Sequence, residues 1–364
     1  MRQCIILSIC CIYSHGVIKL KKRILMCCVI VLLLLIAVYS RSCTAAVIAG
    51  LRLCGSAVIP ALFPMFVGTK LLTGLLKELQ LPKGFLRLWQ RLFGVSGVCS
   101  YGFLFGLLGG YPLGAAVISE LYGGKSISKA DAEQSLRFCN NSGPGFFLAA
   151  LGVTVLHSAK AGILLYIIHI ISALLVGMLT AGKGSTSITT VRVLPESRSF
   201  GSRFIEAVQS SCAALLQICG LILFFSVFGA LMQSLGFFQL LHYLPRFVTL
   251  REAEAIFRGL LEMSSGIFSL QDCPNAFVLA AFFMGWGGLC IHFQAAALWQ
   301  QVGLSPKGYY SAKLLQGCLS AGMAWLLQYA SQPLAIGICI ALPGVLLILR
   351  FFRNYTGNPG KYAL

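Results

Sequence analysis

The polar side chains best placed for chemistry lie where predicted helices break inside apolar sequence. One break is Asn140-Asn141-Ser142-Gly143, followed by a proline. Each asparagine amide both donates and accepts hydrogen bonds, so the pair could bind a polar solute or help to coordinate a cation. The alternative is that these amides cap the carbonyl and N–H groups that the break itself releases. Inside a membrane such groups need protein or a water-filled cavity around them, and transporters use broken helices to hold polar ligands.

A second break in the first half of the chain is Gly109-Gly110-Tyr111-Pro112, with Gly114 just beyond it. Glycines at such positions let the backbone approach a ligand closely, or let helices pack tightly. The tyrosine could stack on a solute or donate a hydrogen bond to it, and it could equally be a packing residue. The predicted ligand-binding residues of this half are Gly110, Tyr111, Gly114, Asn140, Asn141, Ser142 and Gly143.

The second half of the chain contributes His292 and Gln294 to the same predicted site. They are the polar residues of the apolar stretch 276–301, which is broken at Gly285-Trp286-Gly287-Gly288. A lone buried histidine is more often a structural residue with satisfied hydrogen bonds than a ligand. Both readings of His292 therefore stay open at the level of sequence.

No pattern in the sequence is typical of catalysis or of metal binding. The five histidines are separated, and the fifteen cysteines form no Cys-x-x-Cys pair. No Ser/His/Asp or His-Glu-x-x-His arrangement occurs, and Gly124-Lys125-Ser126 lacks the preceding glycine of a phosphate-binding loop. The acids nearest the first break are Glu120, Asp131 and Glu133, and their positions suit helix capping better than ion coupling. We therefore predict no enzyme activity, no catalytic residue, no metal site and no cofactor.

The composition is that of a polytopic helical membrane protein. Hydrophobic residues make up 58% of the 364 residues and charged residues 10%, and the mean hydropathy is +0.86. A soluble globular domain has about a quarter charged residues. The formal net charge of +18 comes from lysines and arginines in loops between apolar spans. Such residues set orientation in the membrane, so we do not predict nucleic acid as a partner.

The chain matches itself without a gap when Gly106 is aligned with Gly285. In this alignment Gly124, Leu136, Cys139 and Gly143 meet Gly303, Leu315, Cys318 and Gly322. An upstream arm repeats as well, with 62–68 matching 223–229. We predict an all-α polytopic membrane fold of two inverted structural repeats, each with a broken or re-entrant helical hairpin.

The predicted domain boundaries lie where polar sequence interrupts the apolar spans. Residues 1–40 hold an N-terminal extension and a signal-anchor helix, 41–181 the first repeat, 182–203 a polar basic linker, 204–350 the second repeat, and 351–364 a polar tail. Residues 1–18 lack the pattern of a secretory signal and are either a short extension or an effect of start-site choice. The mixed-charge stretch 236–274 is predicted to be a linker, and 309–329 and 334–349 are the last two crossings.

The stretch 97–122 is predicted to be a re-entrant hairpin. Each half on either side of its central break is too short to cross about 30 Å of hydrocarbon at about 1.5 Å per residue. The alternative is one kinked span. With re-entrant hairpins in both halves, the linker is cytoplasmic because it carries Lys183, Arg192, Arg198 and Arg203, and Lys70 is left inside a span.

Two local signals predict where helices begin. Ser128 followed by Asp131 is a capping box that opens a helix. This helix is predicted to reach Asn140-Asn141-Ser142 and to break at Gly143-Pro144. Ser305-Pro306 is read as a cap with proline in the first helical position, just before the crossing 309–329.

Three of these motifs, in order, resemble one family. They are Gly110-Tyr111-Pro112-Leu113-Gly114-Ala115, then 128–133, then Phe138-Cys139-Asn140-Asn141-Ser142-Gly143-Pro144. Together they resemble the sporulation integral membrane proteins of the YlbJ type, in the nucleoside-recognition or Gate domain superfamily. The resemblance covers about residues 40 to 350 and is weaker in the second half, where Leu289-Cys290-Ile291-His292 replaces Gly-Tyr-Pro.

The resemblance implies a multi-pass protein of the cell membrane in an endospore-forming bacterium, in the mother-cell or forespore membrane. It implies a role in spore formation, in cortex or envelope assembly. Two functions then compete. The first is a transporter-like protein for a small polar solute such as a nucleoside, and the second is a non-transporting scaffold or signalling component. The expected partners are the lipid bilayer, the solute and a coupling ion of unassigned identity, with a homo-oligomer left open.

Overall fold

The computed structural model describes residues 23–76, 81–182, 199–239 and 249–330, and the single residues 337, 341 and 344. Every element within these ranges is helical. Four contiguous elements carry the site in the first half: α5 (Ser100–Gly109), α6 (Leu113–Gly123), α7 (Lys129–Cys139) and the π-helix η3 (Phe146–Val155). The others are α2 (Ser40–Leu53), η1 (Cys54–Val58), α3 (Ile59–Leu76), α4 (Lys83–Phe93), η2 (Gly97–Cys99), α8 (Ala159–Leu179), α9 (Phe200–Ser234), α10 (Leu250–Leu261), α11 (Met263–Phe268), α12 (Ala276–Trp286), α13 (Gly288–Gln301) and α14 (Tyr309–Tyr329).

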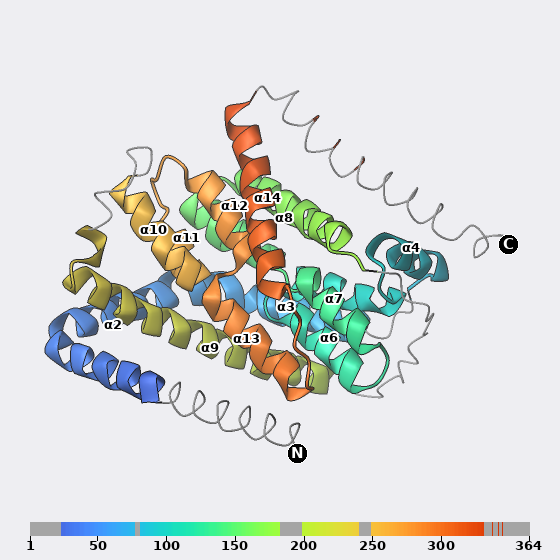
Figure 1. Cartoon of the computed structure of the whole chain (residues 1–364), viewed down its shortest axis with the longest axis horizontal. Coiled ribbons are helices and arrows are strands. Elements are labelled where there is room, and N and C mark those ends of the chain that lie inside the picture. Colours follow the sequence, from blue (N-terminus) through green and yellow to red (C-terminus); the bar gives the residue numbers. More distant parts are fainter. Residues whose placement is uncertain are drawn as a thin grey trace, which may run out of the picture.

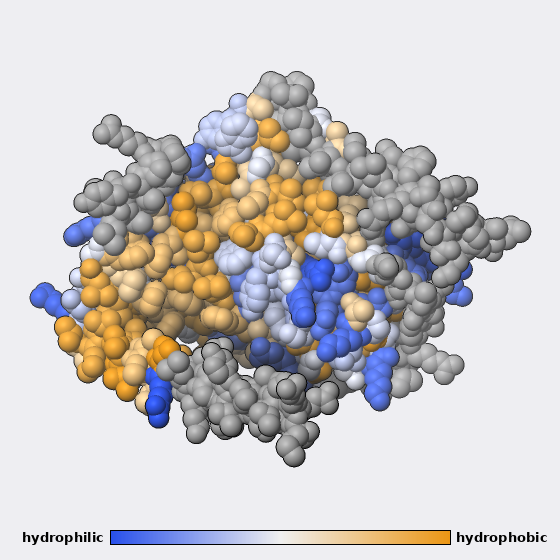
Figure 2. Space-filling view, viewed as in Figure 1, coloured by the Kyte–Doolittle hydropathy of each residue, from blue (hydrophilic) through white to orange (hydrophobic). Residues whose placement is uncertain are grey.

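Three helical segments of the described chain are long and apolar enough to cross a membrane: α8, α9 and the combined run Ala276–Gln301. The number rises to five if each of two sharply bent helix pairs counts as one span. Large apolar side chains such as Leu216, Phe224 and Trp325 are exposed. Figure 2 shows that hydrophobic residues cover a broad area of one face of the molecule. Such a surface suits lipid, so the fold is that of an all-helical, multi-pass membrane protein.

The first break forms a true helical hairpin. Helices α5 and α6 fold back on each other, so that a side chain at Gly102 would run into Ile118, and one at Gly106 would lie 3.1 Å from the Cα of Gly114. The arms have 10 and 11 residues, which is about 15–17 Å of helix and half of what a crossing needs. The chain reverses at Gly110, whose φ of 80° favours glycine.

The matching segment of the second half has a different form. Helices α12 and α13 follow one another along a common direction, so Ala276–Gln301 is one broken helix of 26 residues (Figure 1). Only Gly287 lies between the two helices, and it and Gly288, the first residue of α13, both have positive φ. Of the two forms expected, a hairpin occurs in the first half and a broken helix in the second. The inversion of the repeats stays a prediction.

Helix α7 begins where the sequence predicts, but it ends at Cys139, before the asparagines that the predicted helix reaches. The Ser128 hydroxyl accepts a hydrogen bond from the backbone N–H of Asp131 at 3.1 Å, which caps the first turn. After Cys139 the backbone of Asn140 is extended, and helical structure resumes at Pro144 and leads into η3. The Cys139 carbonyl packs against Gly106 and Gly114, where a Cβ atom would collide with it. These two glycines thus let the hairpin lie directly against the end of α7.

Two local predictions were wrong because tertiary packing overrides them. The stretch 236–274 is not simply a linker, since α10 and α11 occupy much of it and bury Ala255 and Ile267 completely. Ser305-Pro306 does not cap a helix. The last helix, α14, begins at Tyr309 after Gly308, whose positive φ of 80° forms a turn.

The core of the molecule is built around α8, α12 and α14, which pack against one another. Figure 1 shows α14 crossing in front of α12, with α8 beside it. This arrangement places a helix from the end of the chain against the breaks of the first half. The predicted extension 1–18, residues 183–198 of the predicted linker, most of the crossing 334–349 and the tail 351–364 lie outside the described residues. The end of the predicted linker, from Phe200, belongs to α9.

Candidate functional site

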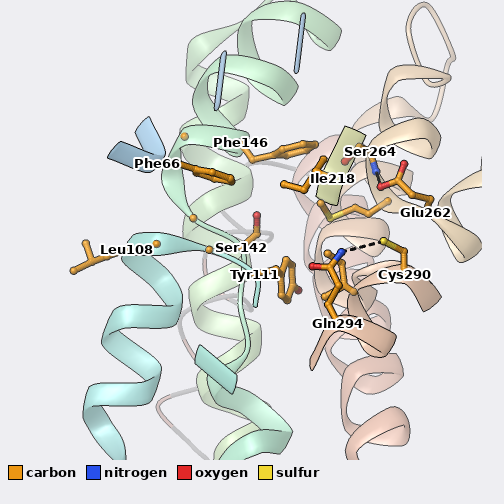
Figure 3. A pocket seen from close by; sticks show the side chains of 16 residues that line it. Phe66, Leu108, Tyr111, Ser142, Phe146, Ile218, Glu262, Ser264, Cys290 and Gln294 are labelled. Atoms are coloured by element: carbon orange, nitrogen blue, oxygen red, sulfur yellow. Dashed lines mark hydrogen bonds between the residues drawn. The ribbon is translucent and has the colours of Figure 1, made fainter. Parts of the chain in front are cut away.

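A small cavity of about 40 Å³ lies where the helix breaks meet. Figure 3 shows side chains from both halves of the chain pointing toward it. Its lining comes from the hairpin tip, the break before η3, the junction of α10 and α11, and the first turns of α13, with one residue each from α3 and α9. The lining residues are Phe66, Leu108, Gly109, Gly110, Tyr111, Ser142, Gly143, Gly145, Phe146, Ile218, Glu262, Met263, Ser264, Cys290, Ile291 and Gln294.

The breaks that form the cavity pack against each other in pairs. A Cβ on Gly143 would lie 3.1 Å from the backbone N of Gly110, so the hairpin tip rests on the break after α7. A Cβ on Gly288 would lie 2.9 Å from the backbone N of Met263, so the break between α12 and α13 rests on the junction of α10 and α11. Irregular backbone is thus gathered in one place, next to a cavity, as a membrane environment requires.

A buried lysine links the two halves beside this cavity. The Lys313 side chain on α14 has no exposed surface. Its ammonium donates to the Gln316 Oε1 at 2.6 Å, the Asn140 carbonyl at 2.9 Å and the Tyr111 hydroxyl at 3.2 Å. All three acceptors are neutral, and they satisfy the three donors of an ammonium. Among the described residues Lys313 forms no ion pair, so its ammonium is stabilised by these hydrogen bonds and by the ring of Tyr111, whose centroid lies 5.2 Å away.

The hydrogen bonds continue from Lys313 into the first half of the chain. The Gln316 amide donates to Asn141 Oδ1 at 3.1 Å, and the Asn141 amide donates to the Phe138 carbonyl at 2.7 Å. Asn141 therefore caps a carbonyl freed at the end of α7 and also joins the Lys313 network. The capping alternative and the network are compatible, because the amide has two ends.

The Asn140 side chain belongs to a second chain of contacts. Its amide donates to the Tyr309 hydroxyl at 3.1 Å, and that hydroxyl lies 3.3 Å from Nδ1 of His292. Two fully buried atoms of this cluster, Asn140 Oδ1 and His292 Nε2, have no hydrogen-bond partner among the described residues. Unpaired buried polar atoms are rare in proteins and mark functional or water-binding positions.

The structure divides the predicted site residues into two groups. Gly110, Tyr111, Ser142, Gly143 and Gln294 line the cavity. Asn140, Asn141 and His292 lie in the buried network around Lys313 and Tyr309, and Gly114 packs against the end of α7. Tyr111 joins both groups, because it lines the cavity, accepts from Lys313, and donates to the Met284 carbonyl at 2.9 Å.

Sequence reasoning missed Lys313 and Glu262. Lys313 lies inside the predicted crossing 309–329, and an ionisable residue within such a span is by itself a functional signal. Glu262 was hidden in the presumed linker, yet it is 3% exposed and lines the cavity. Its two carboxylate oxygens accept from the backbone N–H groups of Ser264 and Ser265 at 2.9 and 2.6 Å.

The cavity is small in this conformation. A water molecule needs about 10–15 Å³ of such volume, so about three water-sized groups fit. Pockets for drug-sized ligands measure about 300–1,000 Å³. This cavity therefore has room for a small ion and water, and a larger solute at this place requires the breaks to move apart.

Comparison with known proteins supports the resemblance carried by the motifs. The chain is 26% identical over 318 residues to "Sporulation integral membrane protein YlbJ" of Bacillus subtilis (strain 168), and the match covers 76% of each protein. No family model matches the chain, and no solved structure matches it. Together with the apolar helices, this similarity makes the chain a multi-pass membrane protein of a sporulating bacterium that is similar to a YlbJ-type sporulation integral membrane protein.

Proposed function

We propose that this protein serves spore formation as a transporter-like membrane protein, which binds or moves a small polar solute at the cavity between its helix breaks. The observation that carries the proposal is that breaks from three separate parts of the chain line one cavity, and that a fourth, at Gly287-Gly288, packs against one of them. Broken helices that meet in this way offer free backbone groups to a ligand, and they are also natural hinges for opening a path.

The polar groups around the cavity favour a small, polar solute. Ser142, Glu262 and Gln294 supply oxygen and nitrogen atoms, whereas Phe66, Phe146 and Ile218 close the apolar side. A nucleoside is the solute suggested by the superfamily resemblance. Because the cavity measures about 40 Å³ in this conformation, a nucleoside would bind only in a more open state.

Transport by the purified protein tests this proposal. The full chain, reconstituted in liposomes, is assayed for counterflow of labelled nucleosides, amino acids and small organic acids. Gln294→Leu keeps the size of the side chain and removes its polar end from the cavity, so counterflow should fall. Gln300→Leu is the matched control, because Gln300 lies on the same helix with its side chain exposed. Absence of counterflow for every solute class, in protein that is folded and correctly inserted, would refute transport.

The scaffold function is favoured by a different observation. Asn140 and Asn141 use their side chains in bonds within the protein, and the cavity is small. A scaffold needs the fold and not the cavity. In a sporulating strain, Gln294→Leu should therefore leave the spore yield unchanged if the protein is a scaffold and lower it if the protein is transporter-like.

A further inference from the structure

The Glu262 carboxylate is a buried charge that faces the cavity. It is 3% exposed and follows the last residue of α10. Each of its oxygens accepts one backbone N–H bond, from Ser264 or Ser265. A carboxylate has about four lone-pair positions, so two remain, and no lysine or arginine of the described chain forms an ion pair with Glu262. A buried carboxylate with spare lone pairs is costly unless a further group binds it.

Neutral oxygens with spare capacity lie around the same cavity. Ser142, Ser264 and Gln294 line it. Within the described chain, the hydrogen bonds of these residues are made by the backbone N–H groups of the two serines and by the amide nitrogen of Gln294, and not by their side-chain oxygens. Gln294 is only 7% exposed. Its amide nitrogen donates only to the Cys290 sulfur, at 3.3 Å. The cavity thus combines one carboxylate with three neutral oxygens.

This set of ligands indicates which cation would fit. Oxygen atoms are the ligands of hard cations such as Na⁺ and Ca²⁺, and a calcium site takes about 6–8 oxygens, commonly from several carboxylates. One carboxylate balances one positive charge. A cavity of about 40 Å³ holds an ion the size of a water molecule with one or two waters. The neighbouring ammonium of Lys313 reaches the lining only through the Tyr111 hydroxyl, so it does not fill the cavity.

We propose that Glu262 binds a monovalent metal cation of the size of Na⁺ in this cavity, with Ser142, Ser264 and Gln294 supplying neutral oxygen ligands. This inference rests on the proposed function, since the cation would share the cavity with the solute and would be the coupling ion. The bound cation would join the Glu262 carboxylate of the second half to Ser142 in the break after α7. Binding therefore stabilises the contact between the two halves.

Thermal unfolding of the purified full-length protein in detergent tests cation binding without any transport assay. The unfolding midpoint is measured at constant ionic strength while NaCl replaces choline chloride, and again with KCl. The expected result is a midpoint that rises with Na⁺ concentration and saturates, because a ligand that binds only the native state stabilises it. Direct binding of ²²Na⁺ to the same preparation should saturate at one ion per chain.

Glu262→Gln should remove the dependence on Na⁺, and Glu252→Gln is its matched control. Glu252 is also buried, at 2% exposure, and also caps a helix, but it does not line the cavity. Its replacement should lower the midpoint and leave the rise with Na⁺ intact. Ser264→Ala keeps the backbone N–H that Glu262 needs, so it reports on the site even if Glu262→Gln fails to fold, and it should weaken Na⁺ binding several-fold.

Three results would overturn the proposal. The first is a midpoint that is equal in NaCl and choline chloride, together with no saturable ²²Na⁺ binding. The second is a dependence on pH alone, which would make the carboxylate a proton site. The third is Na⁺ stabilisation that survives in both Glu262→Gln and Ser264→Ala. The proposed function is tested separately, by the counterflow assay. If the protein binds Na⁺ but shows no counterflow, the cation site is supported and the transport function is refuted.

Discussion

Replacing Lys313 by methionine tests whether the buried ammonium is needed for function or for the fold. Methionine keeps an unbranched, flexible and apolar side chain, and it removes both the charge and three hydrogen bonds. The carbonyl of Asn140, the amide oxygen of Gln316 and the hydroxyl of Tyr111 would each lose one donor.

The two energetic effects of this change oppose each other. Hydrogen bonds within membrane proteins average about 0.6 kcal/mol and reach about 1.7 kcal/mol, so three of them contribute roughly 2 kcal/mol and at most about 5 kcal/mol. A lysine costs about 2.5–3.5 kcal/mol at the centre of a membrane helix and less near an end, where Lys313 lies in α14, and the substitution removes this cost. The free energy of unfolding of Lys313→Met should therefore stay within about 2–3 kcal/mol of the parent value.

The assay compares stability with function in the same variant. Thermal unfolding in detergent and the amount of protein in the membrane measure the fold, and the spore yield of the producing strain measures function. We expect near-normal protein and a spore yield like that of a deletion strain. Lys160→Met is the control, since Lys160 lies exposed at the start of α8, and it should change neither quantity.

Two outcomes would refute this reasoning. If Lys313→Met disappears from the membrane, the ammonium is a structural tie whose hydrogen bonds outweigh the cost of its burial. If the variant is stable and sporulates normally, the network around Lys313 has no part in the function. Lys313→Arg is a further check, because the planar guanidinium keeps the charge and cannot reproduce the compact geometry of three bonds from one nitrogen.

Three further predictions follow from the packing and from the topology. Asn141→Ala should abolish spore formation while protein levels stay near normal, because it removes two hydrogen bonds worth about 0.6 kcal/mol each, and a normal spore yield would exclude the Asn141 side chain from the site. Gly114→Ala should sharply lower the amount of protein in the membrane, because its Cβ would collide with the Cys139 carbonyl, whereas Gly220→Ala, with open space around it, should not. The linker 182–203 should be cytoplasmic. A cysteine at position 187, in a chain without native cysteines, should therefore be labelled only after the cell is made permeable. Labelling from outside the intact cell would contradict the inverted topology.

Local signals in the sequence predicted much of the helical framework. The Ser128 cap marks the start of α7, which ends at Cys139, a few residues before the predicted break at Gly143-Pro144. Helix α8 follows the apolar run after Lys160 closely. The hairpin of the first half was predictable because each arm is too short to cross a membrane. These features depend on residues a few positions apart, so they can be predicted from the sequence without knowledge of the fold.

Other features depend on distant parts of the chain. The glycine-rich breaks at Gly109-Gly110 and Gly287-Gly288 look alike in sequence, yet one reverses the chain and the other does not, because each rests on a different neighbour. The partners of Lys313 are up to 202 positions away, and Glu262 lines the cavity only because α10 and α11 fold back into the core. The cavity and its charges could therefore not be located from the sequence.

The hydrogen bonds between the break after α7 and the last described helix also constrain how the protein is made. Asn140 and Asn141 leave the ribosome 173 and 175 residues before Lys313 and Gln316. At about 5–20 residues per second, this interval is about ten to thirty-five seconds of synthesis. During this interval the Asn140 carbonyl and the Asn141 amide oxygen lack the partners that α14 supplies. Arrival of α14 is therefore the step that completes the interior, and a nascent chain that stops before α14 presents an unsatisfied polar break that membrane proteases and chaperones can recognise.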